Sequence, residues 1–520
     1  MKQLPIGTQS FENLRSNGCL YVDKTELIYK LISSGSVYFL SRPRRFGKSL
    51  LLSTMEALFK GQKELFEGLY IYDKWSWSRQ YPVITIDWSQ IDFSTLEEMK
   101  LNLMDYLEEI ALSYQITLNA ESAPAYFRKL IYALYQKTGK KVAVLIDEYD
   151  VPVTDHLLNP DLEAIRKAVH DFYRIMKGSD KYLQLIFLTG ISKFSGMPVF
   201  SALNNLIDIT LHEQYASICG YTQEELESNF SEYIDITAKH LDMTREYLLD
   251  QIRYWYNGYT WDGQTAIYNP FSTLNFFNNQ RFTDYWFRTG TPTFLIDIIQ
   301  RRNSMDGVLT PAAVAENIFN GYDPADIDEV PLLFQTGYLT IKQKELINGC
   351  ARYTLGIPNS EVNEAFLTCL LKAYGKYSSQ QVDKLRTTME QQIKGCDEAG
   401  FARSLEVMLA TVPYEIQHSS EAYYHSIMLI WMRLLGFSIL GEVLNNIGRA
   451  DAVWEQPEIT VVAEVKYHAE KKIDTLLNEA MAQIRNRRYY NKYLGKVMLL
   501  GVAFSGKDVG CRMEELKTLR

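Results

Sequence analysis

The residues of this chain that are best suited to chemistry lie in a short basic stretch near its amino terminus. Gly47, Lys48 and Ser49 stand between an apolar run at 37–40 and a helix-like segment at 50–59. A strand, a turn ending in Gly-Lys-Ser and a helix together point backbone N–H groups, a helix N-terminus and an ammonium group at one polyphosphate. The hydroxyl of Ser49 adds an oxygen ligand for Mg²⁺. The stretch therefore predicts a phosphate-binding loop with a nucleotide as its ligand.

The beginning of this loop departs from the usual pattern GxxxxGK[ST]. Arg42 stands where the pattern has glycine, and Pro43 removes one backbone donor. A Gly-Lys-Ser in an ordinary basic loop is the alternative interpretation. The residues expected to contact a nucleotide here are Arg42, Arg44, Arg45, Phe46, Gly47, Lys48 and Ser49. Arg44 and Arg45 are also candidates for an arginine finger, although cations beside a triphosphate are expected whether or not they act in catalysis.

An acidic stretch further along the chain supports the same ligand. An apolar run at 141–146 is too short for a typical helix, and Asp147 and Glu148 follow it directly. Such a run is typical of a buried parallel strand, and strands of this kind present their carboxyl ends to the ligand. Asp147 is therefore expected beside the Mg²⁺ held by Ser49, and Glu148 is expected to polarise the attacking water. The alternative, a strand that ends in solvated acids, does not predict a Gly-Lys-Ser upstream.

Two further apolar runs, at 82–87 and 182–190, complete the pattern of a parallel sheet. Helical patterns separate the runs, as crossover connections require; they cover 95–111, 123–137 and 162–176. Thr189, near the end of the last run, is expected to lie by the γ-phosphate as a sensor, with a plain strand-end threonine as the alternative. The order of elements predicts an α/β fold with a P-loop parallel sheet and flanking helices.

Near the carboxyl terminus, Asp451, Glu464 and Lys466 form a second group with the chemistry of a metal site. The segments that carry them are typical of two strands in a hairpin, and side chains two apart on a strand share a face. Two carboxylates on one Mg²⁺ hold a scissile phosphate and a water, which Lys466 can orient. This is the chemistry of phosphodiester hydrolysis. An exposed cross-strand ion pair is the alternative interpretation.

The surroundings of this group strengthen the hypothesis. Glu421 begins a segment whose apolar residues recur at helical spacing, so it is expected close to a buried face. Between Lys466 and Lys496 the chain has eight Lys or Arg against three Asp or Glu, although its net charge is -9. Such a basic surface favours a phosphate backbone, and a solvated helix surface is the alternative.

Composition limits the remaining classes of protein. The 520 residues, 47% of them hydrophobic and 22% charged, are typical of a folded protein with two or three domains. The six cysteines are scattered without CxxC pairs, which argues against a zinc site or a disulfide framework. Because no apolar run has the length of a signal peptide or a membrane span, we expect a cytoplasmic protein without a membrane partner.

The middle of the chain predicts a mostly helical region with a winged-helix-like part. Thr222 followed by Glu225 can cap the first helix of this region. The winged-helix-like part is expected to contain a helix at 330–338, strands at 339–342 and 353–357, and a helix at 361–374. Changes of pattern place three domains at 1–220, 221–400 and 401–520.

Several segments of the chain resemble a known family. They are Tyr21–Thr25, Arg42–Ser49, Leu145–Asp150, Thr189–Lys193, Trp255–Tyr259, Tyr268–Ser272 and Tyr285–Gly290. In these segments the chain is similar to bacterial AAA-ATPase-like proteins that carry a C-terminal PD-(D/E)XK nuclease-like domain. The arginine-rich loop resembles that family's own variant of the phosphate-binding motif.

The resemblance implies a fold and a function for each end of the chain. It implies an N-terminal domain that uses ATP and Mg²⁺, and a C-terminal α/β domain like that of restriction endonucleases. In such a domain Asp451 and Glu464 would bind the metal, Lys466 would be catalytic, and Glu421 matches the acidic residue of the first helix. Gln483 lies in a segment similar to the glutamine-tyrosine helix of related nucleases.

The expected function is ATP binding and hydrolysis coupled to a Mg²⁺-dependent nuclease-like domain that acts on DNA or RNA. The alternative is a nucleotide-dependent switch whose C-terminal domain binds nucleic acid or another partner without cutting it. The sequence leaves the oligomeric state open.

Overall fold

The computed structural model describes residues 1–156, 159–193, 200, 202–286, 313–320, 329–347, 349–363, 379–409, 424, 428, 439–445, 448–456, 459–488, 490, 496–506 and 508–517. The chain divides into two compact units. The first comprises residues 1–290 and 311–361, and the second comprises residues 291–310 and 362–520. This division does not fall at residues 220 and 400, and the three domains expected from the sequence remain a prediction.

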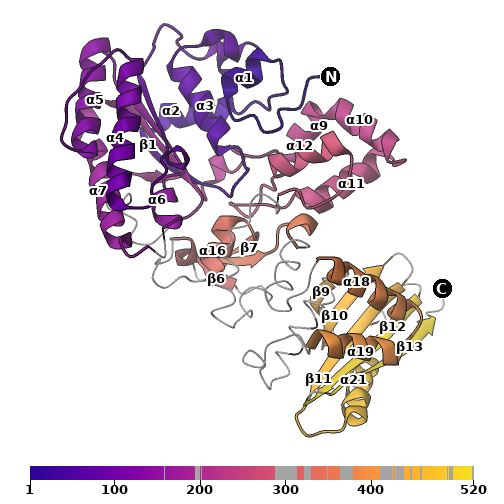
Figure 1. Ribbon diagram of the computed structural model, residues 1–520. Helices are drawn as coiled ribbons and strands as arrows, with labels where there is room; N and C mark the ends of the chain where they lie inside the picture. The colour runs from indigo at the N-terminus through magenta and orange to yellow at the C-terminus, as the bar shows by residue number, and fades with distance from the viewer. Residues whose placement is uncertain are drawn as a thin grey trace. The chain divides into compact units, whose positions relative to one another are not determined.

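The core of the first unit is a five-stranded parallel sheet in the order β2-β3-β4-β1-β5 (Figure 1). Its strands are β1 (Val37–Ser41), β2 (Val83–Asp87), β3 (Val142–Asp147), β4 (Leu183–Gly190) and β5 (Ile207–Asp208). The four apolar runs predicted as strands are confirmed, since each is mostly buried within the sheet. Strand β4 lies between β1, which leads into the Gly-Lys-Ser turn, and β3, which ends at Asp147.

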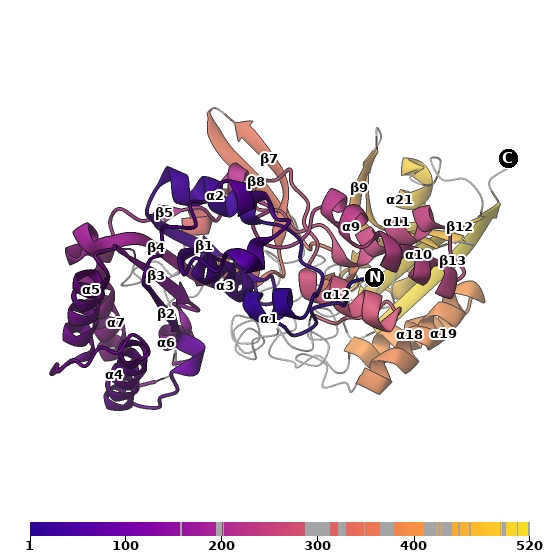
Figure 2. The same ribbon diagram turned by 90° about the horizontal axis from the view of Figure 1, so that it is seen from above.

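Three long helices pack side by side on one face of this sheet, and a fourth covers the other face (Figures 1 and 2). The three are α4 (Leu96–Ser113), α5 (Ala123–Thr138) and α7 (Leu162–Gly178), and the fourth is α3 (Lys48–Phe59). A capping box of Thr95 and Glu98 fixes the start of α4. Among the residues that the structure describes, no helix combines the length and the apolar character needed to cross a membrane.

Shorter helices complete the sheet domain. They are α1 (Phe11–Ser16), α2 (Thr25–Ser34), α6 (Val151–Thr154) and the 3₁₀ helices η1 (Lys63–Phe66), η2 (Tyr70–Asp73), η3 (Trp88–Gln90), η4 (Asp180–Tyr182) and η5 (Glu213–Tyr215). Helix α1 packs against α3 and η1, and α6 packs against α7. Helix α1, near the amino terminus, therefore supports α3, the helix that begins at Lys48.

Strand β2 is an edge of the sheet, and a tyrosine of α4 and the tyrosine that caps its end cover free backbone groups of the strand. The hydroxyl oxygen of Tyr114 lies 2.9 Å from the nitrogen and 3.0 Å from the oxygen of Val83. The hydroxyl of Tyr106 accepts a hydrogen bond from the N–H of Asp87 at 3.4 Å. Because uncovered edge strands invite pairing with other chains, these hydroxyls protect the outer side of the sheet.

A group of helices follows the sheet within the first unit: α9 (Gln223–Asn229), α10 (Ser231–His240), α11 (Arg245–Tyr256) and α12 (Pro270–Asn279). The predicted cap is present, since Thr222 and Glu225 form a capping box at the start of α9. One apolar core joins these helices to the segment before α2. It includes Leu20, Val22, Phe230, Leu248, Tyr256 and Phe276.

A three-stranded sheet in the order β6-β8-β7 completes the first unit. The elements of this part are β6 (Ala313–Ala315), η6 (Glu316–Asn320), α16 (Glu329–Thr336), β7 (Thr340–Ile347) and β8 (Cys350–Gly356). The hairpin of β7 and β8 is longer than predicted, because β7 is exposed after Ile341 and lacks the alternating pattern of a half-buried strand. Of the helix predicted at 361–374, residues 361–363 are helical and the others lie outside the described residues.

The second unit contains a five-stranded mixed sheet in the order β13-β12-β11-β10-β9. Its elements are α18 (Ser379–Lys394), α19 (Glu398–Leu409), β9 (Ile439–Asn445), β10 (Gly448–Gln456), β11 (Ile459–Tyr467), α21 (Ile473–Arg487), β12 (Lys496–Ser505) and β13 (Asp508–Lys517). Strands β11 and β12 are parallel, with α21 as their crossover, and the other neighbours are antiparallel. Alternate residues of β11 pack on α19 and on α21, so these helices cover opposite faces. The predicted β10–β11 hairpin is confirmed.

Candidate functional site

The backbone of the basic loop has the form expected between a strand and a helix. Gly47 is the N-cap of α3 and adopts φ 90°, in the left-handed region that glycine occupies without steric cost. Arg45 also has a positive φ, 69°, which is uncommon for a residue with a side chain. Lys48 is the first residue of α3 and Ser49 lies in its first turn, where backbone N–H groups have no partner within the helix.

The side chain of Lys48 folds back over the loop. Its Nζ donates hydrogen bonds to the carbonyl oxygens of Arg42, at 2.9 Å, and of Pro43, at 3.0 Å. Burial lowers the pKa of Lys48, and the nearby charges of Asp147 and Glu148 oppose this effect. An ammonium group that is held only by loop carbonyls can exchange them for phosphate oxygens.

The side chain of Arg42 faces the protein interior, and the expected contact of this residue with a nucleotide stays a prediction. It is fully buried, and its guanidinium lies 4.0 Å from the centre of the Trp261 ring. Its nitrogens donate hydrogen bonds to three carbonyl oxygens, those of Ser41 at 2.8 Å, Thr210 at 2.9 Å and Tyr215 at 3.3 Å. These contacts occupy the guanidinium, so the Arg42 side chain supports the loop from behind.

The other residues of the loop are held by aromatic side chains from later in the sequence. Phe46 is fully buried, with its ring centre 4.8 Å from that of Tyr259 and 5.4 Å from that of Trp261. The exposed Arg45 lies over the ring of Phe271 at 5.1 Å. The carbonyl oxygen of Arg44 accepts a hydrogen bond from the indole Nε1 of Trp286 at 3.1 Å. Sequence reasoning assigned no role to these aromatic residues, although they lie in or beside the family-like segments at 255–259, 268–272 and 285–290.

The acidic stretch and Thr189 meet at the carboxyl edge of the sheet. The strand register pairs Leu40 with Thr189 and Asp87 with Asp147, and β3 and β4 are neighbours. The hydroxyl of Thr189 donates a hydrogen bond to the buried carboxylate of Asp147. The structure therefore brings together the expected sensor and the expected metal ligand, beside the strand that leads into the loop.

Glu148 and Asp150 lie in the turn that follows Asp147. Glu148 is half-buried and adopts φ 50°, a strained conformation for a residue with a side chain. Burial raises its pKa, and the charge of Lys48 opposes the rise. The buried Asp150 accepts hydrogen bonds from the N–H groups of Ser192, at 2.7 Å, and Ile191, at 3.2 Å. Sequence reasoning gave Asp150 no role, yet it ties the acidic turn to the segment after Thr189.

The second unit brings two of the four C-terminal candidates together. Glu464 is fully buried in β11, and Nζ of Lys466 lies 3.3 Å from its Oε1. The β10–β11 ladder pairs Ala452 with Ala463, and Asp451 and Glu464 are the next residues beyond this pair on their strands. The side chain of Asp451 and the whole of Glu421 lie outside the described residues.

The face of the sheet that carries Glu464 is also the face of α21. Val462, two residues before Glu464, packs with Met481 and Ile484 of this helix. The half-buried Gln483 belongs to the same helix. Gln483 therefore belongs to the helix that covers the face of the sheet on which Glu464 lies.

Comparison with known proteins agrees with the two kinds of domain predicted for this chain. Residues 5–200 match the family described as "Predicted AAA-ATPase", and residues 419–514 match the "PD-(D/E)XK nuclease superfamily". The chain is 34% identical over 517 residues to a protein of Azotobacter chroococcum mcd 1 described as "Uncharacterized protein in vnfD 5'region", an alignment that covers 97% of this chain and 96% of that protein. The chain belongs to the AAA-ATPase-like proteins with a C-terminal PD-(D/E)XK domain. This architecture confirms the resemblance and supports a nucleotide-hydrolysing and nuclease-like role.

In the AAA-ATPase-like domain an apolar recess of about 60 Å³ adjoins the phosphate-binding loop. Gly47 and Phe46 form one side of it, and Tyr21, Val22 and Tyr221 are among its other walls. Lys24, at its rim, pairs with Glu225 at 2.6 Å. The recess thus joins the segment before α2, the loop and the start of the helical region.

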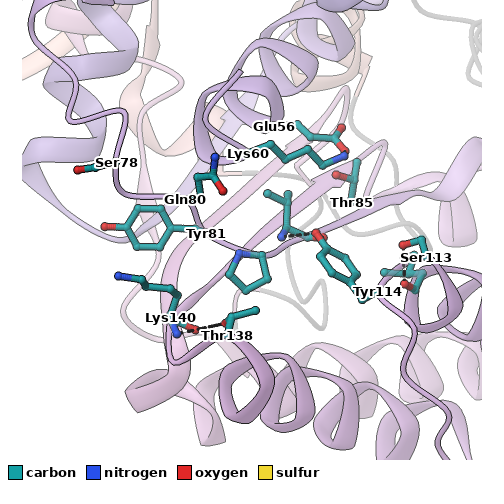
Figure 3. A pocket seen from close by; sticks show the side chains of 13 residues that line it. Glu56, Lys60, Ser78, Gln80, Tyr81, Thr85, Ser113, Tyr114, Thr138 and Lys140 are labelled. Atoms are coloured by element: carbon teal, nitrogen blue, oxygen red, sulfur yellow. Dashed lines mark hydrogen bonds and ion pairs between the residues drawn. The ribbon is translucent and has the colours of Figure 1, made fainter. Parts of the chain in front are cut away.

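A larger cavity of about 740 Å³ lies on the same domain, at the amino ends of the strands (Figure 3). The ion pair of Glu56 and Lys60, with Nζ and Oε1 2.6 Å apart, forms one wall, and Tyr114 forms another. Val83, the first residue of β2, lines it as well. None of the predicted site residues lines this cavity, so the AAA-ATPase-like site and the cavity are separate.

Proposed function

We propose that the first unit binds and hydrolyses ATP together with Mg²⁺ at the carboxyl edge of its sheet. The observation that carries the proposal is the meeting of Lys48, Asp147 and Thr189 at this edge. In the proposed site Lys48 contacts the β- and γ-phosphates, and Thr189 senses the γ-phosphate. Glu148 orients the attacking water, and its raised pKa suits a group that must accept a proton near neutral pH.

The chemistry of the side chains fits Mg²⁺. The part of the chain that the structure describes contains no group of three or more His, Cys, Asp or Glu arranged to hold a metal ion. Mg²⁺ is commonly held by one or two protein oxygens together with substrate phosphates, and Ser49 with the carboxylate of Asp147 provides such a pair. Ser49 and Asp147 would hold the Mg²⁺, which would supply positive charge to offset the charge that develops on the phosphates during transfer.

For the second unit we propose Mg²⁺-dependent hydrolysis of a DNA or RNA strand. The support is the buried Glu464 with Lys466 beside it, and the pairing of Ala452 with Ala463, the residues next to Asp451 and Glu464. In the proposed site the two carboxylates hold the metal, Lys466 orients the water or stabilises the developing charge, and Glu421 assists. A carboxylate as buried as Glu464 requires a positive charge nearby, which Lys466 and a metal ion would supply.

A nucleotide-dependent switch is the second candidate, and the packing of the loop favours it. Lys48 is bound to loop carbonyls, and Phe46 packs against Tyr259 and Trp261. A nucleotide that draws Lys48 away from these carbonyls therefore alters a loop to which the helical region is attached. In this function the C-terminal domain binds nucleic acid or another partner without cutting it.

One set of assays on the full chain tests both proposals. ATP binding and hydrolysis are measured for the wild type and Lys48→Ala, and cleavage of labelled DNA and RNA is measured with and without Mg²⁺ and ATP. We expect Lys48→Ala to abolish ATP binding, and unchanged affinity in this variant would contradict the nucleotide site. Metal-dependent cleavage that is lost in Asp451→Ala supports the nuclease. Binding of nucleic acid without cleavage supports the switch.

A further inference from the structure

A buried carboxylate with no role in the proposed chemistry lies at the end of the first unit. Glu361 is fully buried. One of its oxygens accepts a hydrogen bond from the backbone N–H of Trp286 at 2.7 Å, and the hydroxyl of Ser272 lies 2.9 Å and 2.7 Å from the two oxygens. These donors come from two segments of the chain that are far from residue 361 in sequence.

The described surroundings of Glu361 give its carboxylate hydrogen bonds but no cation. Within the described part of the chain no Lys, Arg or His forms an ion pair with it, and the titratable groups near it are Asp284, Tyr256 and Tyr259. Burial raises its pKa to about 8. Burial of a carboxyl without a cation lowers the stability of the fold. A role in packing alone therefore does not explain Glu361.

Trp286 connects Glu361 to the phosphate-binding loop. Its fully buried indole donates a hydrogen bond from Nε1 to the carbonyl oxygen of Arg44 at 3.1 Å. Gly337 lies against Trp286 and against Pro43, the residue before Arg44, since a Cβ atom added to it would come within 2.8 Å of Cγ of Pro43 and 3.4 Å of Cζ2 of Trp286. A continuous path of hydrogen bonds and contacts therefore runs from Glu361 through Trp286 to the loop residues Pro43 and Arg44.

Glu361 lies at the point where the chain leaves the first unit. Glu361 is the last residue of the first unit, and the chain passes into the second unit at Val362. At the other end of the path, Arg44 directly follows Pro43, whose carbonyl binds the ammonium of Lys48. A change in the hydrogen bonds between Lys48 and the loop can therefore pass through Arg44 and Trp286 to Glu361, where the chain leaves the first unit.

We propose that Trp286 and Glu361 are positioning residues of the nucleotide site, which hold the loop through the Arg44 carbonyl and link its conformation to the start of the second unit. The proposal rests on the proposed ATP site. Phosphates that take Lys48 from the carbonyls of Arg42 and Pro43 release that side of the loop, and the Trp286 indole then holds Arg44 in a new position. Because linkage is reciprocal, a change at Glu361 alters the affinity for ATP.

The test compares ATP affinity and the ATP-induced change of tryptophan fluorescence in full-length variants. Trp286→Phe keeps an aromatic ring but removes the donor to Arg44, and Trp255→Phe, at a half-buried ring beside Phe282, is the matched control. We expect Trp286→Phe to weaken ATP binding about fivefold to tenfold, which corresponds to one buried hydrogen bond, and to remove most of the fluorescence change. The control should keep both.

Variants of Glu361 separate positioning from bulk stability. At pH 7 we expect Glu361→Gln, which keeps an acceptor for the Trp286 N–H, to bind ATP within about twofold of the wild type, and Glu361→Ala to bind about tenfold more weakly. If Trp286→Phe and Glu361→Ala bind ATP as the wild type does, the proposal is wrong while the ATP site stands. If the wild type itself binds no ATP, the proposed function fails first.

Discussion

The hydroxyl of Thr189 donates a hydrogen bond to the carboxylate of Asp147 across the neighbouring strands β4 and β3. This contact holds the proposed sensor against the proposed metal ligand. We expect Thr189→Val to lower kcat for ATP hydrolysis about tenfold, because a hydrogen bond to a charged group contributes about 1.5–3 kcal/mol. The Kd for ATP should change less than about threefold. Thr189→Ser, which keeps the hydroxyl, is the control, and a valine variant as active as wild type would contradict the sensor role.

The raised pKa of Glu148 predicts the pH dependence of hydrolysis. Burial raises this pKa despite the opposing charge of Lys48, and a general base must be ionised to act. The acidic limb of kcat should therefore lie at higher pH than the ordinary glutamate pKa of 4.5. We expect Glu148→Gln to lose about 100-fold or more in kcat and to keep ATP binding. A limb that persists unchanged in the residual activity of this variant would assign the titration to another group.

Arg42 is expected to be a structural residue of the loop. Its guanidinium serves three backbone carbonyls and lies over Trp261, and a lysine lacks the planar fork needed for this arrangement. We expect Arg42→Lys to lower the free energy of unfolding by about 2–4 kcal/mol, measured by urea denaturation. Arg45→Lys, at an exposed position, should change it by less than about 0.5 kcal/mol. Equal stabilities of the two variants would contradict the structural role.

Glu361 should make the first unit less stable as pH rises. Its pKa is about 8 in the folded chain against an ordinary value of 4.5, so the folded state binds more protons than the unfolded state between these two values. The stability that Glu361 contributes is therefore present at low pH, falls by about 1.4 kcal/mol per pH unit inside this window, and stays constant above it. Glu361→Gln has no such proton to lose.

The measurement is the difference in thermal midpoint between Glu361→Gln and the wild type from pH 5 to pH 9. The neighbouring Asp284, Tyr256 and Tyr259 are present in both proteins, so their titration largely cancels in the difference. The difference should grow in favour of Glu361→Gln up to about pH 8 and then level off. A constant difference across the whole range would mean that the carboxyl is ionised throughout.

The arrangement of Asp147 and Thr189 at one edge of the sheet, beside the strand that leads to Gly47, could be predicted because its signals are local. Each signal lies within a short segment of about ten residues: one is the apolar run that ends at Asp147, and the other is Gly47 at the start of a helix. Parallel strands bring such ends together at one edge of the sheet. The position of Thr189 at this edge followed from the same rule, because Thr189 lies near the end of the apolar run at 182–190. The strand order confirms this arrangement, because β4, which carries Thr189, lies between β1, which leads to Gly47, and β3, which ends at Asp147.

The surroundings of the loop could not be predicted, because they depend on contacts between distant segments. Trp286 reaches Arg44 across 242 residues of sequence, and Glu361 reaches Trp286 across 75. No periodicity or motif relates positions so far apart, and only the folded chain places them in contact. The same reason explains Arg42, for which the motif suggested a phosphate contact while Trp261 and the carbonyl of Tyr215 draw its side chain inward.

Lys466 provides the sharpest test of the C-terminal domain. Its ammonium lies 3.3 Å from the buried carboxylate of Glu464, where it can act on a water or a developing charge. We expect Lys466→Ala to reduce Mg²⁺-dependent cleavage of DNA or RNA about 100-fold, the usual cost of removing one preorganised charge-stabilising group. Lys471→Ala, at an exposed lysine that pairs with Glu479 at 2.8 Å, is the matched control and should cut as the wild type does. Both variants should bind nucleic acid alike, because one lysine contributes little to a backbone contact surface. If Lys466→Ala cuts normally, the proposed catalytic role of this lysine is wrong, and if neither the wild type nor the control cuts while both bind, the domain works as the switch.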